Sequence, residues 1–264
     1  TLDGVSLNSP EDQCVFWANM NSYASLLGSV QIQRGVGSST TGDGAFGGSI
    51  AMQTKLPQMQ PMLEVTGSYG SYNTWRTGGQ FSTGLLGKHW VVDGAYHQTT
   101  TDGYLHGTHG KSGSYTAGVA WLSEDSRLVL KYRNLGNFES TGQAWNGVTA
   151  GNDDYSLNAY GGVKTYEDLY RMGLGRYNSL YERFIEAWDD PTAWKTERYA
   201  KVDGSLWDRT TDNFWQNHNI LSAAWRINDH WSTTAALRYT YGYGYYDEFR
   251  YQNKGASKFG LNYV

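Results

Sequence analysis

The chain has 264 residues, a formal net charge of −4 and a mean hydropathy of −0.60. No window approaches the roughly 18 consecutive apolar residues of a membrane-spanning helix. The 11 Trp, 21 Tyr and 33 Gly residues fit a membrane β-barrel, whose alternating strands average out polar, but they also fit a soluble β-sandwich. Cys14 is the only cysteine, so no internal disulfide is expected. Nothing in this composition indicates a nucleic-acid partner.

A glycine-rich stretch over residues 28–55 organises the N-terminal part of the chain. It opens with an alternation in which Val30 and Ile32 share one face, and Ile50 and Met52 begin a second short strand. The intervening glycines allow positive φ angles and close backbone packing. A phosphate-binding loop is excluded because no GxxxxGK[ST] motif is present. Such a segment has too few apolar residues for a core of its own and needs a wall around it.

Three runs in this region, Leu2–Val5, Val30–Gly37 and Gly44–Ile50, resemble the end of the plug domain of TonB-dependent outer-membrane receptors. The resemblance implies that residues 1–55 are the C-terminal part of a plug and that residues 56–264 are the N-terminal strands and extracellular loops of a barrel. It also implies structural roles in the plug for Arg34, Gly35, Gly37, Gly44, Phe46 and Gly47. In the family, an arginine at the position of Arg34 pairs with barrel glutamates.

Beyond Met62, seven segments alternate apolar and polar residues, each about as long as the 9–11 residues that cross a bilayer at a tilt. The turns near 86–87, 124–126 and 228–229 are short, whereas the connections over 100–113 and 137–213 are long. Aromatic residues gather at both ends of the segments, as two interfacial girdles would. Four tryptophans fall at the short-turn end, and tyrosines together with Trp75 and Trp215 fall at the long-loop end. We therefore predict an all-β fold: an antiparallel transmembrane β-barrel, incomplete in this chain, with an α+β plug segment in its lumen.

Two segments depart from this alternation. A helical turn is predicted over residues 19–27, because apolar residues recur there at helical spacing. Within the long loop, an apolar stripe predicts a helix stopped by Asp189-Asp190-Pro191. The stripe comprises Leu180, Tyr181, Phe184, Ile185 and Trp188.

No Ser-His-Asp or CxxC constellation is present, so no enzyme is expected. His106 and His109 make a weak metal signal without a third ligand, and neither a metal site nor a cofactor is predicted. The candidate ligand-binding residues lie on the apical plug and the inward strand phase: Asp12, Gln13, Trp17, His97, Arg133 and Arg238. Basic side chains outnumber acids on that phase, which favours an anionic ligand, or else pairing with plug acids such as Asp3 and Asp43.

The resemblance implies import across the outer membrane of a Gram-negative bacterium, energised by the TonB–ExbB–ExbD complex through a segment outside this chain. The basic lumen favours a ferric siderophore or similar anionic metal chelate as the substrate. An oligosaccharide, haem or peptide importer, a passive porin-like channel or adhesin, and a soluble sugar-binding β-domain remain alternatives. Membrane lipid and a surface lipoprotein are the other expected partners.

Overall fold

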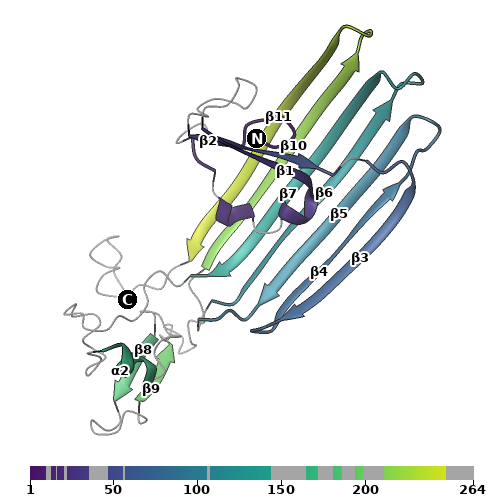
Figure 1. Ribbon diagram of the computed structural model, residues 1–264. Helices are drawn as coiled ribbons and strands as arrows, with labels where there is room; N and C mark the ends of the chain where they lie inside the picture. The colour runs from purple at the N-terminus through teal and green to yellow at the C-terminus, as the bar shows by residue number, and fades with distance from the viewer. Residues whose placement is uncertain are drawn as a thin grey trace, which may run out of the picture.

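The computed structural model describes residues 1–9, 13–15, 17–20, 23–35, 47–55, 57–105, 108–143, 165–171, 181–185, 194–198 and 211–247. Its main feature is a seven-stranded antiparallel sheet in the order β11-β10-β7-β6-β5-β4-β3 (Figure 1). The strands are β3 (Pro61–Gly70), β4 (Thr74–Thr83), β5 (Trp90–Thr101), β6 (Gly110–Leu122), β7 (Leu128–Gly142), β10 (Thr211–Arg226) and β11 (Ser232–Asp247).

The sheet is an up-and-down meander, since each strand pairs with the next strand of the sheet along the chain. Among the described residues its two edges, β3 and β11, do not pair with one another, so the sheet is an open, incomplete barrel wall. The seven predicted segments are confirmed. Later strands are longer than expected: β10 and β11 each have 16 residues, against 10 in β3.

One face of the sheet is apolar and exposed within this chain. Leu63, Val65 and Leu237 are 78%, 80% and 73% exposed, although they sit mid-strand. The register keeps such residues on one face, because Leu63 pairs with Phe81 and Leu221 with Leu237. Trp90 likewise pairs with Trp121 near the short turns. This is the outward phase that the alternation predicts, and we call it the outward face.

The N-terminal segment packs against the opposite, inward face (Figure 1). It contains the 3-10 turns η1 (Trp17–Met20) and η2 (Tyr23–Leu26), followed by a hairpin of β1 (Leu27–Arg34) and β2 (Gly48–Thr54). The predicted helical turn is therefore present as two 3-10 turns. The segment has a small shared core with β7 and β10: Leu2, Tyr23, Leu26, Met52, Leu135 and Ile220.

The predicted helix of the long loop is wrong for residues 181–185. They form β8 (Tyr181–Ile185), which pairs with β9 (Trp194–Arg198), and the helix in the described part of the loop is α2 (Tyr166–Arg171) instead. Tyr, Phe and Ile favour a pleated strand over a helix when a partner strand is available. Leu180 and Trp188, the ends of the predicted stripe, lie outside the described residues.

No helix in the described part of the chain is long and apolar enough to cross a membrane.

Candidate functional site

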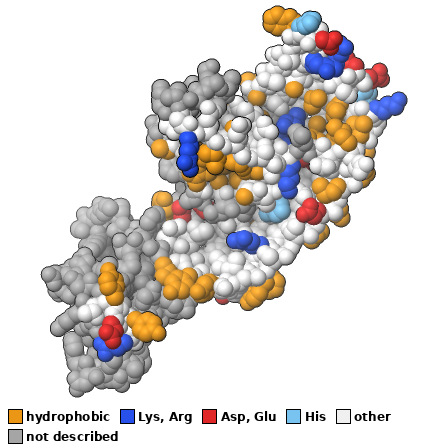
Figure 2. Space-filling model, in the orientation of Figure 1, with side chains coloured by type: hydrophobic (Ala, Val, Ile, Leu, Met, Phe, Trp, Pro, Cys, Tyr) orange, Lys and Arg blue, Asp and Glu red, His pale blue; other side chains and the backbone are white. Residues whose placement is uncertain are grey.

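The N-terminal segment and the inward face of β3–β6 enclose an open groove of about 620 Å³. Lys55, at the end of β2, lines it from the N-terminal segment. Glu64, Arg76 and His97 line it from β3, β4 and β5. Figure 2 shows this side of the molecule, where basic and acidic side chains lie beside the N-terminal segment. The groove is therefore a charged, solvent-accessible space at the junction of the two parts of the chain.

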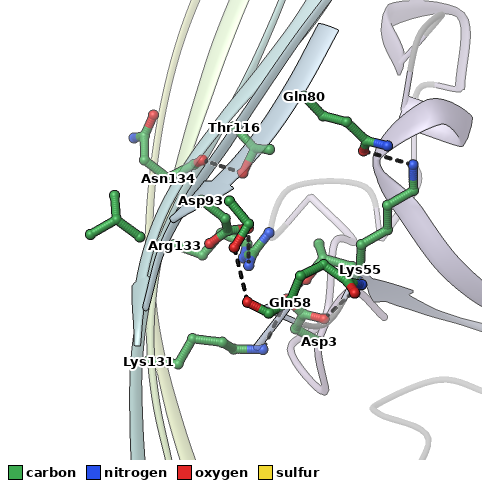
Figure 3. Close-up of polar contacts among 12 residues, drawn as sticks. Asp3, Lys55, Gln58, Gln80, Asp93, Thr116, Lys131, Arg133 and Asn134 are labelled. Carbon is green, nitrogen blue, oxygen red and sulfur yellow. Dashed lines mark hydrogen bonds and ion pairs between the residues drawn. The ribbon is translucent and has the colours of Figure 1, made fainter. Parts of the chain in front are cut away.

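Lys55 is the point where the N-terminal segment reaches the groove wall. Its ammonium Nζ donates to Gln80 Oε1 over 2.9 Å (Figure 3). Gln80 Nε2 in turn donates to the Glu64 carboxylate. The amide thus links a cation of the N-terminal segment to an anion of β3. Among the described residues, no hydrogen bond or ion pair holds the Arg76 guanidinium, which leaves it exposed to a ligand in the groove.

Arg133, on β7, lines an adjoining cavity of about 290 Å³ that shares Lys55 and Glu64 with the groove. Its Nη2 donates to Asp93 Oδ2 over 2.8 Å, and its side chain is only 2% exposed. Gly118, which is opposite Arg133 in the β6–β7 register, makes the pairing feasible. A Cβ at Gly118 would lie 2.4 Å from Asp93 Oδ1. Because burial of an unpaired charge is costly, this pair holds β5 and β7 together across β6.

Asp3 joins the N-terminal segment to the wall a second time. Its carboxylate accepts from the Thr54 backbone N–H at 2.9 Å and from Thr54 Oγ1 at 2.7 Å. Lys131 Nζ on β7 lies 3.8 Å from Asp3 Oδ2 (Figure 3). The Asp3 side chain is 6% exposed, so this ion pair is shielded from solvent and fixes the segment to β7.

A buried polar cluster at the same interface involves Tyr23. Its ring packs edge-on to His218 of β10 at 6.3 Å, and its hydroxyl donates to Asn137 Oδ1 over 3.4 Å. Burial raises the pKa of the Tyr23 phenol far above its ordinary value. The hydroxyl is therefore a neutral hydrogen-bond group at any physiological pH.

The structure separates the predicted ligand-binding residues rather than gathering them. His97 lines the groove. Trp17, which is 49% exposed, lines a second cavity of about 410 Å³ on the N-terminal segment together with Arg34. Arg238 is half-buried on β11, with Nη1 lacking a partner among the described residues. Arg133 is buried against Asp93 as above.

The structure describes only some of the remaining predicted residues of the N-terminal segment. Gln13 is exposed with a φ of 58°, whereas Asp12 lies outside the described residues. Gly35 has a φ of 81°, and its N–H donates to the Gly47 carbonyl over 3.1 Å. A glycine with positive φ therefore ends β1 where the chain enters the connection to β2. Gly37, Gly44 and Phe46 lie outside the described residues.

Lys55 and Gln80, which form the contact between segment and wall, have no sequence pattern that marks them as site residues. Gln80 falls on the inward strand phase, but its uncharged amide does not distinguish it from the other polar residues of that phase. Lys55 follows β2, and no repeating pattern in the sequence predicts that this position contacts the sheet. Within the described residues, no group of three or more His, Cys, Asp or Glu side chains is placed to hold a metal ion.

No protein-family model matches the sequence, and no curated protein matches it. Solved structures do match. The ferric-catecholate import receptor Fiu of E. coli K12 has a TM-score of 0.56 at 16% identity over 82% of this chain and 29% of its own. The siderophore receptor PiuA of Acinetobacter baumannii has a TM-score of 0.59 at 14% identity over 93% of this chain and 29% of its own.

The ferric yersiniabactin uptake receptor FyuA of Yersinia pestis matches with a TM-score of 0.55 at 14% identity, again over 82% of this chain and 29% of its own. This is the fold of part of a TonB-dependent outer-membrane receptor. The chain spans less than a third of the length of each of these three receptors. In the receptor fold, the seven-stranded sheet is a portion of the barrel wall and the groove lies on its luminal side.

Proposed function

We propose that this chain is part of an outer-membrane receptor that imports an anionic metal chelate, such as a ferric siderophore, by TonB-dependent rearrangement of residues 1–55. In this proposal residues 1–55 are plug and residues 56–264 are barrel. The single observation that supports it most strongly is the packing of the N-terminal segment on the inward face through the Leu2 core and the Asp3–Lys131 ion pair. A passive pore has no reason to fill its lumen with its own chain.

The charge of the inward face supports an anionic substrate. Two cations, Lys55 and Arg76, line the groove against one carboxylate, Glu64, and the neutral His97 lies with them. Glu64 is already engaged by Gln80, and Arg76 has no partner among the described residues. A cation facing a confined luminal space attracts anions and raises their local concentration. The structural neighbours Fiu, PiuA and FyuA are ferric-catecholate, siderophore and ferric yersiniabactin receptors, which supports the same substrate class.

The decisive experiment measures uptake of radiolabelled iron, bound to catecholate or hydroxamate chelators, by cells in which this protein is the sole iron receptor. We expect energy-dependent uptake that disappears in cells without TonB. TonB-independent uptake would identify a passive channel. The same cells are also given a radiolabelled neutral oligosaccharide. Salt-insensitive uptake of that sugar without iron uptake would identify the protein as an oligosaccharide importer.

Charge variants locate the ligand contact within the same assay. Arg76→Gln should raise the apparent dissociation constant roughly 10- to 100-fold and reduce its salt dependence, since a charge-assisted contact contributes about 1.5–3 kcal/mol. Arg238→Gln tests a second inward cation, on β11 and outside the groove lining, and should have the same effect where the ligand also reaches β11. Arg127→Gln is the matched control, because Arg127 pairs with Asp125 at 3.8 Å in a short turn away from the groove. An equal loss with the control would mean that overall charge, not the groove, governs binding.

A further inference from the structure

Three asparagine amides lie on the outward face of β7 and β10, where the alternation otherwise places apolar residues. Asn134 is half-buried and is paired with Asn219 across the two strands. Its neighbours in the chain, Arg133 and Leu135, face inward. Figure 3 shows Asn134 on the side of the sheet away from the N-terminal segment. Asn134, Asn217 and Asn219 form what we call the amide centre.

The amide centre is a connected hydrogen-bond network. Asn134 Nδ2 donates to Asn217 Oδ1 over 2.6 Å and to Asn219 Oδ1 over 2.9 Å. Asn219 Nδ2 donates to Asn217 Oδ1 over 3.0 Å. Two tyrosines join it: Asn217 Nδ2 donates to the Tyr115 hydroxyl over 2.9 Å, and the Tyr132 hydroxyl donates to Asn219 Oδ1 over 2.7 Å. The network fixes the amides in one orientation while leaving the second Asn219 N–H without an acceptor among the described residues.

A glycine makes this arrangement possible. Gly136 lies opposite Tyr115 in the β6–β7 register, and a Cβ there would lie 2.0 Å from Tyr115 Cζ. The Tyr115 ring therefore occupies the space over Gly136 and reaches across β7 to Asn217 on β10. This close approach needs a residue without a side chain at Gly136.

Aromatic rings also flank the amide centre on the β11 side. Tyr239 and Tyr241 are the β11 partners of Asn219 and Asn217, and they are 67% and 54% exposed. Trp215 packs edge-on to Tyr241 with ring centroids 5.7 Å apart. Uncharged amides thus lie beside exposed aromatic rings, while Arg133 and Arg238, on the same strands of the described chain, are on the inward phase.

The depth of the amide centre limits what can cover it. Asn134 is six residues along β7 from Leu128, and Gly136, the partner of Asn217, is eight residues from it. At about 3.3 Å per residue and a tilt of about 40°, these steps are roughly 15–20 Å along the membrane normal, within an apolar band of about 25 Å. With Leu128 at the short-turn boundary, Asn134 lies nearer the middle of that band, and Asn217 lies roughly 5 Å inside its long-loop boundary. Asn217 Nδ2 also donates to Asn134 Oδ1 over 3.3 Å, so within the described residues the network satisfies the amide N–H groups except the second one of Asn219. Acyl chains offer that N–H no acceptor, because hydrocarbon has no hydrogen-bond partner.

We propose that the amide centre and its tyrosines bind the uncharged sugar headgroup of an outer-leaflet glycolipid. Amides exchange hydrogen bonds with sugar hydroxyls, and exposed aromatic faces pack against the apolar C–H faces of a sugar ring. In the described part of the chain no hydrogen bond or ion pair joins a cation to these amides, which disfavours a phosphate headgroup. This inference rests on the proposed location in the outer membrane but not on import, so uptake measurements do not bear on it.

Lipid retention tests the inference directly. The intact protein is reconstituted in nanodiscs of phosphatidylethanolamine containing equal minor fractions of monoglucosyl diacylglycerol and phosphatidylglycerol with matched acyl chains. After mild detergent extraction, mass spectrometry quantifies the lipid retained per protein. We expect the glycolipid to be enriched over phosphatidylglycerol by about tenfold, and Asn217→Leu combined with Asn219→Leu to abolish the enrichment. Thr233→Leu, on the outward face of β11 near the short turn, should leave it unchanged.

Other outcomes overturn the inference. Equal retention of the two lipids by the unmodified protein would do so, as would enrichment of phosphatidylglycerol or unchanged enrichment in the double variant. A dimer that dissociates on Asn217→Leu substitution, seen by sedimentation, would show that a second copy covers the amides. If the double variant does not fold, Tyr241→Leu and Tyr241→Phe decide: the leucine should reduce enrichment and the phenylalanine should preserve it.

Discussion

Arg133 shows how a single residue on the inward face is held by its strand neighbours rather than by a ligand. Its guanidinium contacts Asp93 and is almost wholly removed from solvent. We expect Arg133→Gln to lower the free energy of unfolding by about 3–5 kcal/mol, because the Asp93 charge stays buried without a partner. Combining it with Asp93→Asn should recover much of the loss. Denaturant unfolding of the purified protein in detergent measures both values.

A cost of about 1 kcal/mol or less for Arg133→Gln, with no recovery in the double variant, would contradict this assignment. It would place the pair among solvent-exposed ion pairs, which contribute little to stability. Arg133 would then remain available to a ligand, as the sequence analysis expected.

Gly118 provides an independent test of the same contact. A Cβ at this position would lie 2.4 Å from Asp93 Oδ1 and 3.2 Å from Arg133 Nη2, so Gly118→Ala should displace the ion pair and cost about 1–3 kcal/mol. Gly67→Ala is the matched control, since no atom lies within 4 Å of its added Cβ. Equal effects of the two substitutions on the unfolding midpoint would show that backbone propensity alone is being measured.

At the scale of the strands, β11 shows the two faces of the sheet in neighbouring residues. Leu237 is 73% exposed on an apolar phase, and Ala236 precedes it on the inward face. Leu237→Arg should destabilise the barrel in a bilayer by about 2–4 kcal/mol, because the charge meets hydrocarbon. Ala236→Arg should cost distinctly less. Reversal of this order in bilayer unfolding measurements would mean that the two faces have been exchanged.

Strand number and phase could be predicted from the sequence because they follow from a local rule of period two. Leu63, Val119 and Leu130 all carry that signal without knowledge of any partner. The β8 strand could not be predicted in this way: its tyrosine, phenylalanine and isoleucine also fit a helical stripe, and the choice depended on β9. A pairing partner distant in sequence decides such segments.

The candidate site was less predictable for a related reason. Alternation placed Arg133 and Asp93 on the same face, but only the register brings them within 2.8 Å and turns two apparent ligand groups into one structural pair. Lys55 and Gln80 meet because the N-terminal segment docks on β4, which no periodic signal encodes. The face that a charged side chain occupies can therefore be predicted from the sequence, whereas the residue with which it pairs cannot.

At the scale of the whole molecule, two surfaces of one sheet serve different surroundings. The inward face carries ion pairs, a charged groove and a docked N-terminal segment, and the outward face is mostly apolar and carries the amide centre. This division explains how a chain of mean hydropathy −0.60 can form a membrane wall. Half of each strand's residues face a polar lumen, so the average conceals the apolar face.

The central claim is that residues 1–55 lie against the inward face of this wall, and cross-linking tests it most directly. With Cys14 first replaced by Ser, cysteines are placed at Asp3 and Lys131, whose side chains face one another at 3.8 Å. The matched pair combines Asp3→Cys with Leu130→Cys, one residue away but on the outward face. A short bifunctional thiol reagent added to the intact protein should join the first pair and not the second. Efficient joining of Asp3 to Leu130, or failure to join Asp3 to Lys131 in folded protein, would contradict an enclosed plug.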